Sequence, residues 1–229
     1  DSAVGDGIDQ NGDGVADGCV GHGTQVAGII GAIGNNDIDI AGAAWNVRIM
    51  PIRISGPECD GYISSIVKGL NYAVVNGADI VNVSFGAATF MTSARMAFSA
   101  AIDAGLTIVA SAGNGGLYST LPASLEGVIS VGAHGPEDAP DRRTSFSPRF
   151  GKVEVVAPGS NVYTLNVAAI TGDAGRAFVT GTSIAAPFVS GLIALMLAID
   201  STLSPNEILT LLEGNAKDLP DLGFSRWDG

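Results

Sequence analysis

The sequence predicts an α/β protein of three layers, with a mostly parallel central sheet covered by helices on both faces. Helical and extended patterns alternate through the middle of the chain. The extended segments are largely continuous apolar runs, such as Ile80-Val81-Asn82-Val83, as expected when helices bury both faces of a sheet. With 46% hydrophobic residues the chain can bury one sizeable core, so residues 1–229 are expected to form a single domain.

The expected elements begin after a Gly- and Asp-rich segment, residues 1–20, which has little periodicity and is predicted to be loop. Apolar periodicity then predicts helices at residues 23–32, 64–75 and 91–104. Extended segments are predicted between and after these helices, at residues 47–54, 79–85, 106–111 and 128–133.

The pattern changes in the C-terminal third. Short strands are predicted at residues 153–157, 161–165 and 176–180, and the last two of these are expected to form a short β-hairpin. A long apolar helix is predicted over residues 183–199. Ser204, Pro205 and Glu207 then supply an N-cap, a first-position proline and a capping-box acid for one more helix.

Composition argues against several kinds of partner. The net charge is -12 and the 11 Lys and Arg residues are scattered, whereas nucleic-acid binding needs clustered basic residues. The apolar run that ends at Ile199 is expected to be a buried helix rather than a membrane span. No basic-then-apolar leader begins the sequence. We therefore expect a monomer that binds neither nucleic acid nor membrane.

A serine at the start of the long helix is the candidate nucleophile. Gly181-Thr182-Ser183 forms a turn of small residues between a strand and a helix, and Pro187 follows within about the first turn. A serine there exposes its hydroxyl, and its N–H is among the unpaired donors of the helix terminus, which suits an attack that creates an oxyanion. From this segment alone, a simple N-cap role for Ser183 is equally consistent.

The general base must be one of the two histidines. His22 stands between glycines at the start of a predicted helix. His134 falls in a predicted polar loop, residues 132–136, where a solvated surface histidine is the simpler interpretation. His22 is therefore the better partner for a serine nucleophile.

Residues 21–28, Gly-His-Gly-Thr-Gln-Val-Ala-Gly, and residues 181–187, Gly-Thr-Ser-Ile-Ala-Ala-Pro, resemble the histidine and serine motifs of the subtilase family. Residues 79–86 resemble the family's substrate-binding strand, and residues 110–114 resemble the segment that carries its oxyanion-hole asparagine. These motifs stand in the family's order. The resemblance implies a subtilisin-like fold and a serine endopeptidase with an Asp-His-Ser triad.

The resemblance also implies the role of each residue. Ser183 would form an acyl-enzyme, His22 would transfer the proton, and Asn114 would bind the oxyanion together with the Ser183 N–H. Small residues at 110–113 and 115 would form a roomy apolar first specificity pocket, giving broad specificity. Two segments would pair with an extended polypeptide substrate, and with the pocket they give the substrate-binding residues Ser84, Phe85, Gly86, Cys59, Asp60, Gly61, Ala112 and Gly113.

The aspartate that orients His22 is less clearly marked. Asp1-Ser2-Ala3 resembles the family's aspartate motif with Ala in place of Gly, and Asp1 is our choice. No strand precedes Asp1 in the sequence, and its spacing to His22 is shorter than is usual in the family. Residues 223–229 also resemble a segment that normally continues, so both ends look trimmed. The alternative aspartates are Asp6, Asp9, Asp13 and Asp17.

Two other functions compete with a protease. A homologue without a competent aspartate would keep the groove and act as a peptide-binding module. An esterase or lipase of another α/β type is disfavoured, because Gly-x-Ser-x-Gly is absent around Ser183 and such enzymes place the histidine last.

The first twenty residues also suggest a structural calcium ion. Their oxygen-bearing side chains at positions two apart and Gly14 resemble a calcium loop, and some subtilases carry a comparable loop; a solvated turn is the alternative. The candidate ligands are Asp9, Asn11, Asp13 and Asp17.

The two cysteines, Cys19 and Cys59, permit one disulfide, with free buried thiols as the alternative. By the resemblance, this bridge would tie the histidine loop to the binding rim. A disulfide favours secretion, and the resemblance also implies a pro-segment as a partner. Gln25, Ile184 and Phe188 depart from the His, Met and His that are usual in the family.

Overall fold

The computed structural model describes residues 21–37, 40–55, 61–89, 91–135, 142–166 and 175–219. The alternation predicted from the sequence is confirmed, with most boundaries within two residues of those expected. In chain order the elements are α1 (His22–Gly31), α2 (Ile63–Val75), β1 (Ile80–Val83), α3 (Thr92–Asp103), β2 (Thr107–Ser111), β3 (Val128–His134), β4 (Val155–Pro158), β5 (Val162–Leu165), β6 (Arg176–Val179), α5 (Thr182–Ile199) and α6 (Pro205–Asn215).

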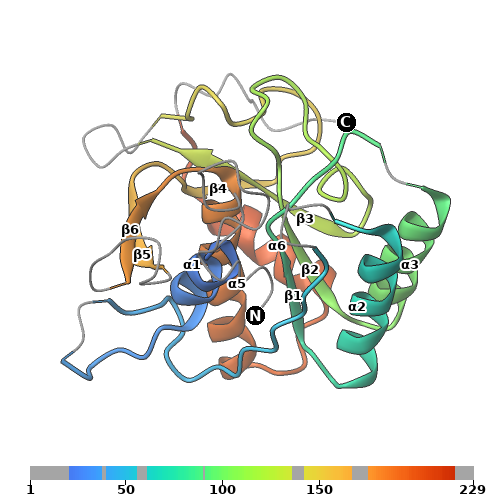
Figure 1. The fold of residues 1–229 in the computed structure, drawn as a ribbon, viewed down its shortest axis with the longest axis horizontal. Coiled ribbons are helices and arrows are strands. Elements are labelled where there is room, and N and C mark those ends of the chain that lie inside the picture. Colours follow the sequence, from blue (N-terminus) through green and yellow to red (C-terminus); the bar gives the residue numbers. More distant parts are fainter. Residues whose placement is uncertain are drawn as a thin grey trace, which may run out of the picture.

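The central sheet is parallel and has the order β1-β2-β3-β4 among the described strands. Its two faces are buried by different helices (Figure 1). On β2, Ile108 and Ala110 pack with Phe98 of α3 and with the buried face of α2. Val109, between them, packs with α5 and α6 on the opposite face. This alternation along a strand buried on both sides confirms the predicted three-layer α/β architecture.

The short hairpin lies beside α1. β5 and β6 pair antiparallel, from Val162 opposite Val179 to Leu165 opposite Arg176, as predicted. Gly28 of α1 faces this hairpin, and a Cβ atom at Gly28 would come within 2.9 Å of the Thr164 hydroxyl. The absence of a side chain at Gly28 therefore lets α1 and β5 approach closely.

The capping signals of the last helix are also confirmed. The Ser204 hydroxyl accepts a hydrogen bond from the Glu207 N–H at 3.4 Å, and the Glu207 carboxylate accepts one from the Ser204 N–H at 2.8 Å. This reciprocal capping box satisfies donors that a helix terminus leaves unpaired.

The sequence-based prediction of a strand at residues 47–54 is wrong. These residues form no ladder with any other segment that the structure describes, and only an isolated antiparallel bridge joins Ser55 to Gly61. The physical reason is distance from the sheet, because a cavity separates residues 49–54 from β1.

Two further expectations need correction. His134 does not lie in a solvated loop: it closes β3, is partly buried, and pairs with Pro158 and Arg143. Pro187 lies inside α5 rather than in its first turn. By length and composition alone α5 could cross a membrane, but half of it is buried and it packs on the sheet and α1, as a core helix does.

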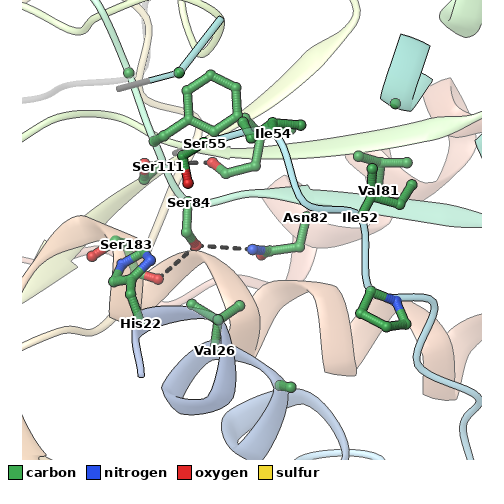
Figure 2. Close-up of a pocket in the computed structure, with 18 of the residues that line it drawn as sticks. His22, Val26, Ile52, Ile54, Ser55, Val81, Asn82, Ser84, Ser111 and Ser183 are labelled. Carbon is green, nitrogen blue, oxygen red and sulfur yellow. Dashed lines mark hydrogen bonds between the residues drawn. The ribbon is translucent and has the colours of Figure 1, made fainter. Parts of the chain in front are cut away.

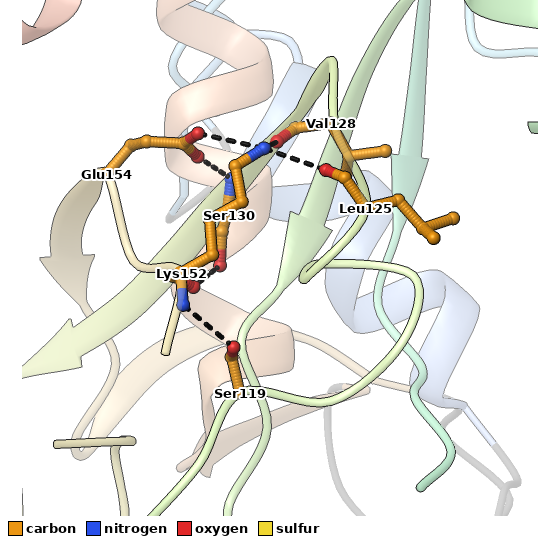
Figure 3. A network of polar contacts seen from close by, with 6 residues as sticks. All are labelled: Ser119, Leu125, Val128, Ser130, Lys152 and Glu154. Atoms are coloured by element: carbon orange, nitrogen blue, oxygen red, sulfur yellow. Dashed lines mark hydrogen bonds and ion pairs between the residues drawn. The ribbon is translucent and has the colours of Figure 1, made fainter. Parts of the chain in front are cut away.

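An ammonium group lies inside a ring of oxygen atoms next to β3 (Figure 3). The Lys152 Nζ donates to the carbonyls of Leu125 at 2.8 Å and Val128 at 2.6 Å, and lies 2.9 Å from a carboxylate oxygen of Glu154. The other Glu154 oxygen accepts from the Ser130 N–H at 2.5 Å. Burial raises the pKa of Glu154, and the Ser130 bond and the Lys152 charge oppose that rise.

Candidate active site

A cavity of about 1170 Å³ brings together most of the residues expected to carry function (Figure 2). It extends from the N-termini of α1 and α5 along β1, with residues 49–55 on its other side and α2 at its base. The predicted site residues that line it are His22, Gly61, Ser84, Phe85, Gly86, Gly113, Asn114 and Ser183.

Ser183 lies in the first turn of α5, directly after β6 and a glycine turn. Gly181 has φ +153°, and a Cβ atom at Gly181 would lie 3.0 Å from the Ser183 Oγ, 3.4 Å from the Asn114 Nδ2 and 3.7 Å from the Ser183 backbone nitrogen. A hydroxyl and two N–H donors therefore surround one point that only glycine leaves empty. A carbonyl group that enters beside this point would have its carbon near the hydroxyl and its developing oxyanion near the two donors, as an acyl transfer requires.

Asn114 comes shortly after β2, at the carboxyl edge of the sheet. Its side-chain oxygen accepts from the Thr182 N–H at 2.9 Å and from the Thr182 hydroxyl at 3.0 Å. Because a backbone N–H can only donate, this contact fixes which end of the amide is oxygen. The Nδ2 end is thereby directed toward Ser183 and Gly181.

His22 is the first residue of α1 and follows Gly21, whose φ of +84° favours glycine. The imidazole is partly buried and lines the same cavity as Ser183; Figure 2 shows the two side by side. Burial lowers the pKa of His22 below its usual value of 6.5. The ring is then neutral near pH 7, the form in which a histidine accepts a proton.

The expected substrate edge follows β1 directly. Ser84, Phe85 and Gly86 line the cavity. The next residue, Ala87, pairs with Leu121 through both its N–H and its carbonyl, at 2.9 and 3.0 Å. Gly61 lines the opposite rim. An extended polypeptide between these rims would meet backbone donors and acceptors.

The floor of the cavity differs from the expected one. Ala110 and Ala112 are fully buried and do not line it, because β2 and the residues after it are covered by β3 and residue 120. Thr120 takes their place at the surface. A Cβ atom at Gly86 would lie 2.3 Å from the Thr120 Oγ1, and one at Gly113 would lie 2.9 Å from its Cγ2. Thr120 therefore fills the space that these two glycines leave.

Several predicted residues lie outside the described part of the chain. These are the aspartate Asp1 and its alternatives, including Asp6, the calcium-loop residues Asp9, Asn11, Asp13 and Asp17, the rim residues Cys59 and Asp60, and Cys19, the proposed disulfide partner of Cys59. Among the residues that the structure describes, no group of three or more His, Cys, Asp or Glu side chains could hold a metal ion.

The three departures from the family pattern have structural roles. Gln25 donates to the Asn166 side chain at 3.3 Å, and its carbonyl accepts from Thr164 at 3.0 Å, so it ties α1 to β5. Ile184 is 1% exposed, and Phe188 packs against the core on the α5 side of the sheet.

Sequence analysis missed the residues that hold the site together: Thr182, Thr120, Asn82 and Ser190. Thr182 sits beside the recognised serine, and Asn82 lies within a recognised motif, so only their proximity in sequence hinted at a role. Thr120 and Ser190 carry no local signal, because their contacts cross between elements distant in sequence.

Comparison with known proteins agrees with this geometry. The family profile described as "Peptidase_S8: Subtilase family" matches residues 4–229. Subtilisin DY from Bacillus licheniformis is 35% identical over 206 residues, which cover 88% of this chain and 72% of that protein. An extracellular protease from Xanthomonas campestris is 34% identical over 87% of this chain, but the matched part is only 36% of its own length.

Solved structures give the same result. A cold adapted subtilisin-like serine proteinase superposes with a TM-score of 0.77 at 29% identity, over 93% of this chain and 74% of that one. A protease from Pseudoalteromonas arctica superposes with a TM-score of 0.79 at 28% identity, over 95% of this chain and 70% of that one. The fold, the family profile and the relatives together show that this chain belongs to the subtilase family of serine proteases.

Proposed function

We propose that this chain is a serine endopeptidase that cleaves polypeptides through an acyl-enzyme, with Ser183 as nucleophile and His22 as general base. The observation that carries the proposal is the convergence of the Ser183 Oγ, the Ser183 N–H and the Asn114 Nδ2 around the space beside Gly181. A structural N-cap serine would not need a side-chain amide directed at the same point.

In this mechanism the Ser183 oxygen attacks the scissile carbonyl carbon while neutral His22 takes the hydroxyl proton. Negative charge develops on the carbonyl oxygen, and the Asn114 Nδ2 and the Ser183 N–H donate to it. The imidazolium then gives its proton to the leaving amine, and the acyl-enzyme forms. Water, deprotonated by His22, then attacks the ester carbonyl. The bond to the Ser183 oxygen breaks, that oxygen takes the proton back from His22, and the carboxylic acid product leaves.

Asp1 is proposed as the residue that orients His22 and stabilises its imidazolium. Support comes from the cavity, which continues from His22 along β1 between that strand and residues 49–54. An aspartate in this cavity beside His22 would act on the imidazole, as the triad requires.

Substrates are proposed to bind as extended chains between Ser84-Phe85-Gly86 and Gly61, with Cys59 and Asp60 on the same rim. Backbone pairing favours broad specificity, because it does not depend on the substrate's side chains. Phe85, Gly113 and Thr120 line the cavity near Asn114, and this uncharged lining supports a first pocket that accepts apolar side chains.

The remaining expectations from the sequence stand as proposals. They are a structural calcium ion at Asp9, Asn11, Asp13 and Asp17, a Cys19–Cys59 disulfide, secretion, and a pro-segment as partner. Relatives described as an extracellular protease and an extracellular basic protease favour secretion.

Labelling with a fluorophosphonate, followed by peptide mapping, tests the proposed function. We expect one adduct, on Ser183, and loss of both labelling and peptidase activity in Ser183→Ala. Ser147→Ala, which removes a buried hydroxyl away from the cavity, is the control and should label normally. A folded protein that binds peptides but neither labels nor cleaves them would instead be a catalytically impaired homologue.

A further inference from the structure

One carbonyl in the first turn of α5 lacks its regular hydrogen-bond donor. In an α-helix the carbonyl of residue 183 accepts from the N–H of residue 187, but residue 187 is proline and has no N–H. The carbonyl of the nucleophile's own residue therefore lacks its regular partner. A buried carbonyl without a partner is destabilising, and its peptide group is free to tilt.

The Ser84 hydroxyl supplies the missing donor. Its Oγ lies 2.7 Å from the Ser183 carbonyl oxygen, and Figure 2 shows this contact reaching from the end of β1 to the start of α5. Because a carbonyl can only accept, Ser84 must donate its single proton here. Any other contact of the Ser84 oxygen must then be one in which it accepts.

That second contact continues into a chain of hydrogen bonds. The Asn82 Nδ2 donates to the Ser84 Oγ at 2.8 Å. The Asn82 Oδ1 accepts from the Ser190 hydroxyl at 2.9 Å. The Ser183 carbonyl fixes the direction of the bonds through Ser84 and Asn82. The Ser190 hydroxyl has two acceptors in reach, and the Asn82 Oδ1 is nearer than the Ala186 carbonyl, at 2.9 against 3.3 Å.

The chain of bonds begins and ends on one helix. Ser183 and Ser190 are seven residues apart in α5, so they lie two turns apart on the same face. Asn82 and Ser84 are alternate residues and point to the same side of the extended chain. Ser190 is 2% exposed, so this end of the chain of hydrogen bonds is shielded from water.

We propose that Ser84, held by Asn82 and Ser190, is a positioning residue for the nucleophile. By binding the carbonyl that Pro187 leaves unpaired, it fixes the backbone of residue 183. That backbone carries both the attacking Oγ and one of the two oxyanion donors. The inference rests on the proposed function, because it assigns a role within the same site.

A double-mutant cycle between Ser84 and Pro187 tests this inference. Pro187→Ala restores an N–H that can serve the Ser183 carbonyl, so it should make the Ser84 hydroxyl dispensable. In the wild-type background we expect Ser84→Ala to lower kcat and the labelling rate of Ser183 by about tenfold, from the loss of one buried hydrogen bond. KM should change by less than about twofold, because backbone pairing with substrate is kept.

In the Pro187→Ala background, the same Ser84→Ala change should lower kcat and the labelling rate of Ser183 by less than about twofold. Ser84→Thr keeps a hydroxyl and should recover most of the wild-type rate. Ser147→Ala serves as the control, and its effect should be the same with either residue at position 187. Equal losses from Ser84→Ala in both backgrounds would overturn the inference.

A parallel cycle on melting temperature separates this inference from the proposed function. Ser84→Ala should lower the melting temperature by a few degrees with Pro187 present and by much less in Pro187→Ala. If wild-type protein does not label at Ser183, the proposed function fails, yet the thermal cycle still decides whether Ser84 serves this carbonyl. Absence of thermal coupling would overturn the inference in that case also.

Discussion

The Asn114 side-chain oxygen accepts hydrogen bonds from both the backbone N–H and the hydroxyl of Thr182, at 2.9 and 3.0 Å. The same hydroxyl oxygen accepts from the Gly113 N–H at 3.0 Å. One fully buried threonine thus joins the turn after β2 to the start of α5. It also holds the amide of Asn114 with its NH₂ end toward Ser183.

Replacing Thr182 by valine should therefore reduce catalysis without a large effect on substrate binding. The variant keeps the shape of the side chain but removes one donor to Asn114 and the acceptor of Gly113. Of these two hydrogen bonds, the one to Asn114 orients the oxyanion donor, so we expect kcat to fall by about tenfold, as for the loss of roughly one hydrogen bond in the site. Steady-state kinetics on a peptide substrate measure this, with Thr182→Ser as the control that keeps the hydroxyl. A raised KM with unchanged kcat would contradict the positioning role.

Substitution of Asn114 by leucine should have a larger effect, because it removes an oxyanion donor itself. We expect kcat to fall by about 10²–10³-fold, the magnitude known for this change in subtilisin, a member of the same family. Binding of a non-reactive peptide, measured by calorimetry, should stay within about threefold of wild type. An equal loss in peptide binding would mean that Asn114 shapes the groove rather than the transition state.

The pH dependence should report on the proposed partner of His22. Burial lowers the pKa of His22 below 6.5, whereas a carboxylate beside it would raise that pKa by favouring the imidazolium. In Asp1→Asn only burial remains, so the acid limb of kcat/KM should move to lower pH than in wild type and lie below 6.5. A profile of kcat/KM from pH 4.5 to 8 measures this, and identical limbs in the two proteins would exclude Asp1 as the partner.

The thermal stability of the protein should also depend on the protonation of His22. With a folded pKa below 6.5, the unfolded state binds more protons than the folded state as pH falls through 6.5. The stability of Asp1→Asn should therefore decrease from pH 7 to pH 5. Adding His22→Gln to Asp1→Asn should reduce this slope in melting temperatures measured over the same range. An unchanged slope would show that other groups cause it.

Removing the partly buried ammonium of Lys152 should destabilise the protein in a pH-dependent way. Lys152→Met leaves Glu154 charged and without its cation, which costs at most roughly 3 kcal/mol, the value for a fully buried pair, or a melting temperature lower by at most about 6–12 °C. Glu154 already has a raised pKa, and loss of Lys152 raises it further, so the folded variant takes up a proton more readily than the unfolded chain. The destabilisation should thus be smaller at pH 4.5 than at pH 7.

Calorimetry at the two pH values tests this prediction. The matched control is Lys152→Met combined with Glu154→Gln, which removes the uncompensated charge and should recover part of the lost stability at pH 7 only. A loss that is independent of pH in Lys152→Met would show that packing, not charge, sets the effect.

Calcium removal should lower thermal stability if residues 9–17 form the proposed site. A site that binds only the folded state stabilises it by about 2.7 kcal/mol at a calcium concentration of 100 times Kd. A chelator should therefore reduce the melting temperature by about 5–10 °C. Asp13→Ala should remove this calcium dependence, whereas Asp103→Ala, at the exposed end of α3, should retain it. Persistence of the effect in Asp13→Ala would place the ion elsewhere.

Much of the fold was predictable because it depends on local patterns. The helices and strands follow apolar periodicity, and α6 follows from a capping box that is complete within four residues. Residues 47–54 show the limit of this reasoning. Their apolar pattern suits a strand, but a strand also needs a neighbour, and β1 lies across the cavity.

The residues of the candidate site were likewise predictable only where a local sequence pattern marks them. Ser183, His22 and Asn114 stand in motifs whose glycines and helix starts can be read from the sequence, and the structure brings them to one cavity. Ser190 and Thr120 could not be found in this way, because their contacts form only in the folded protein. Ser190 reaches Asn82 where α5 packs on β1, and Thr120 lies against Gly86 and Gly113. Ala112 was misplaced because the sequence shows a small residue but not which side of the turn is covered.

The oxygen ring around Lys152 has the ligands of an alkali-metal site: two main-chain carbonyls and a carboxylate around a single positive charge. Here the charge is covalently part of the chain. Because the ammonium is attached to the polypeptide, neither dilution nor a chelator can remove it from the ring of oxygen atoms. This part of the molecule should therefore keep its shape in water of any hardness.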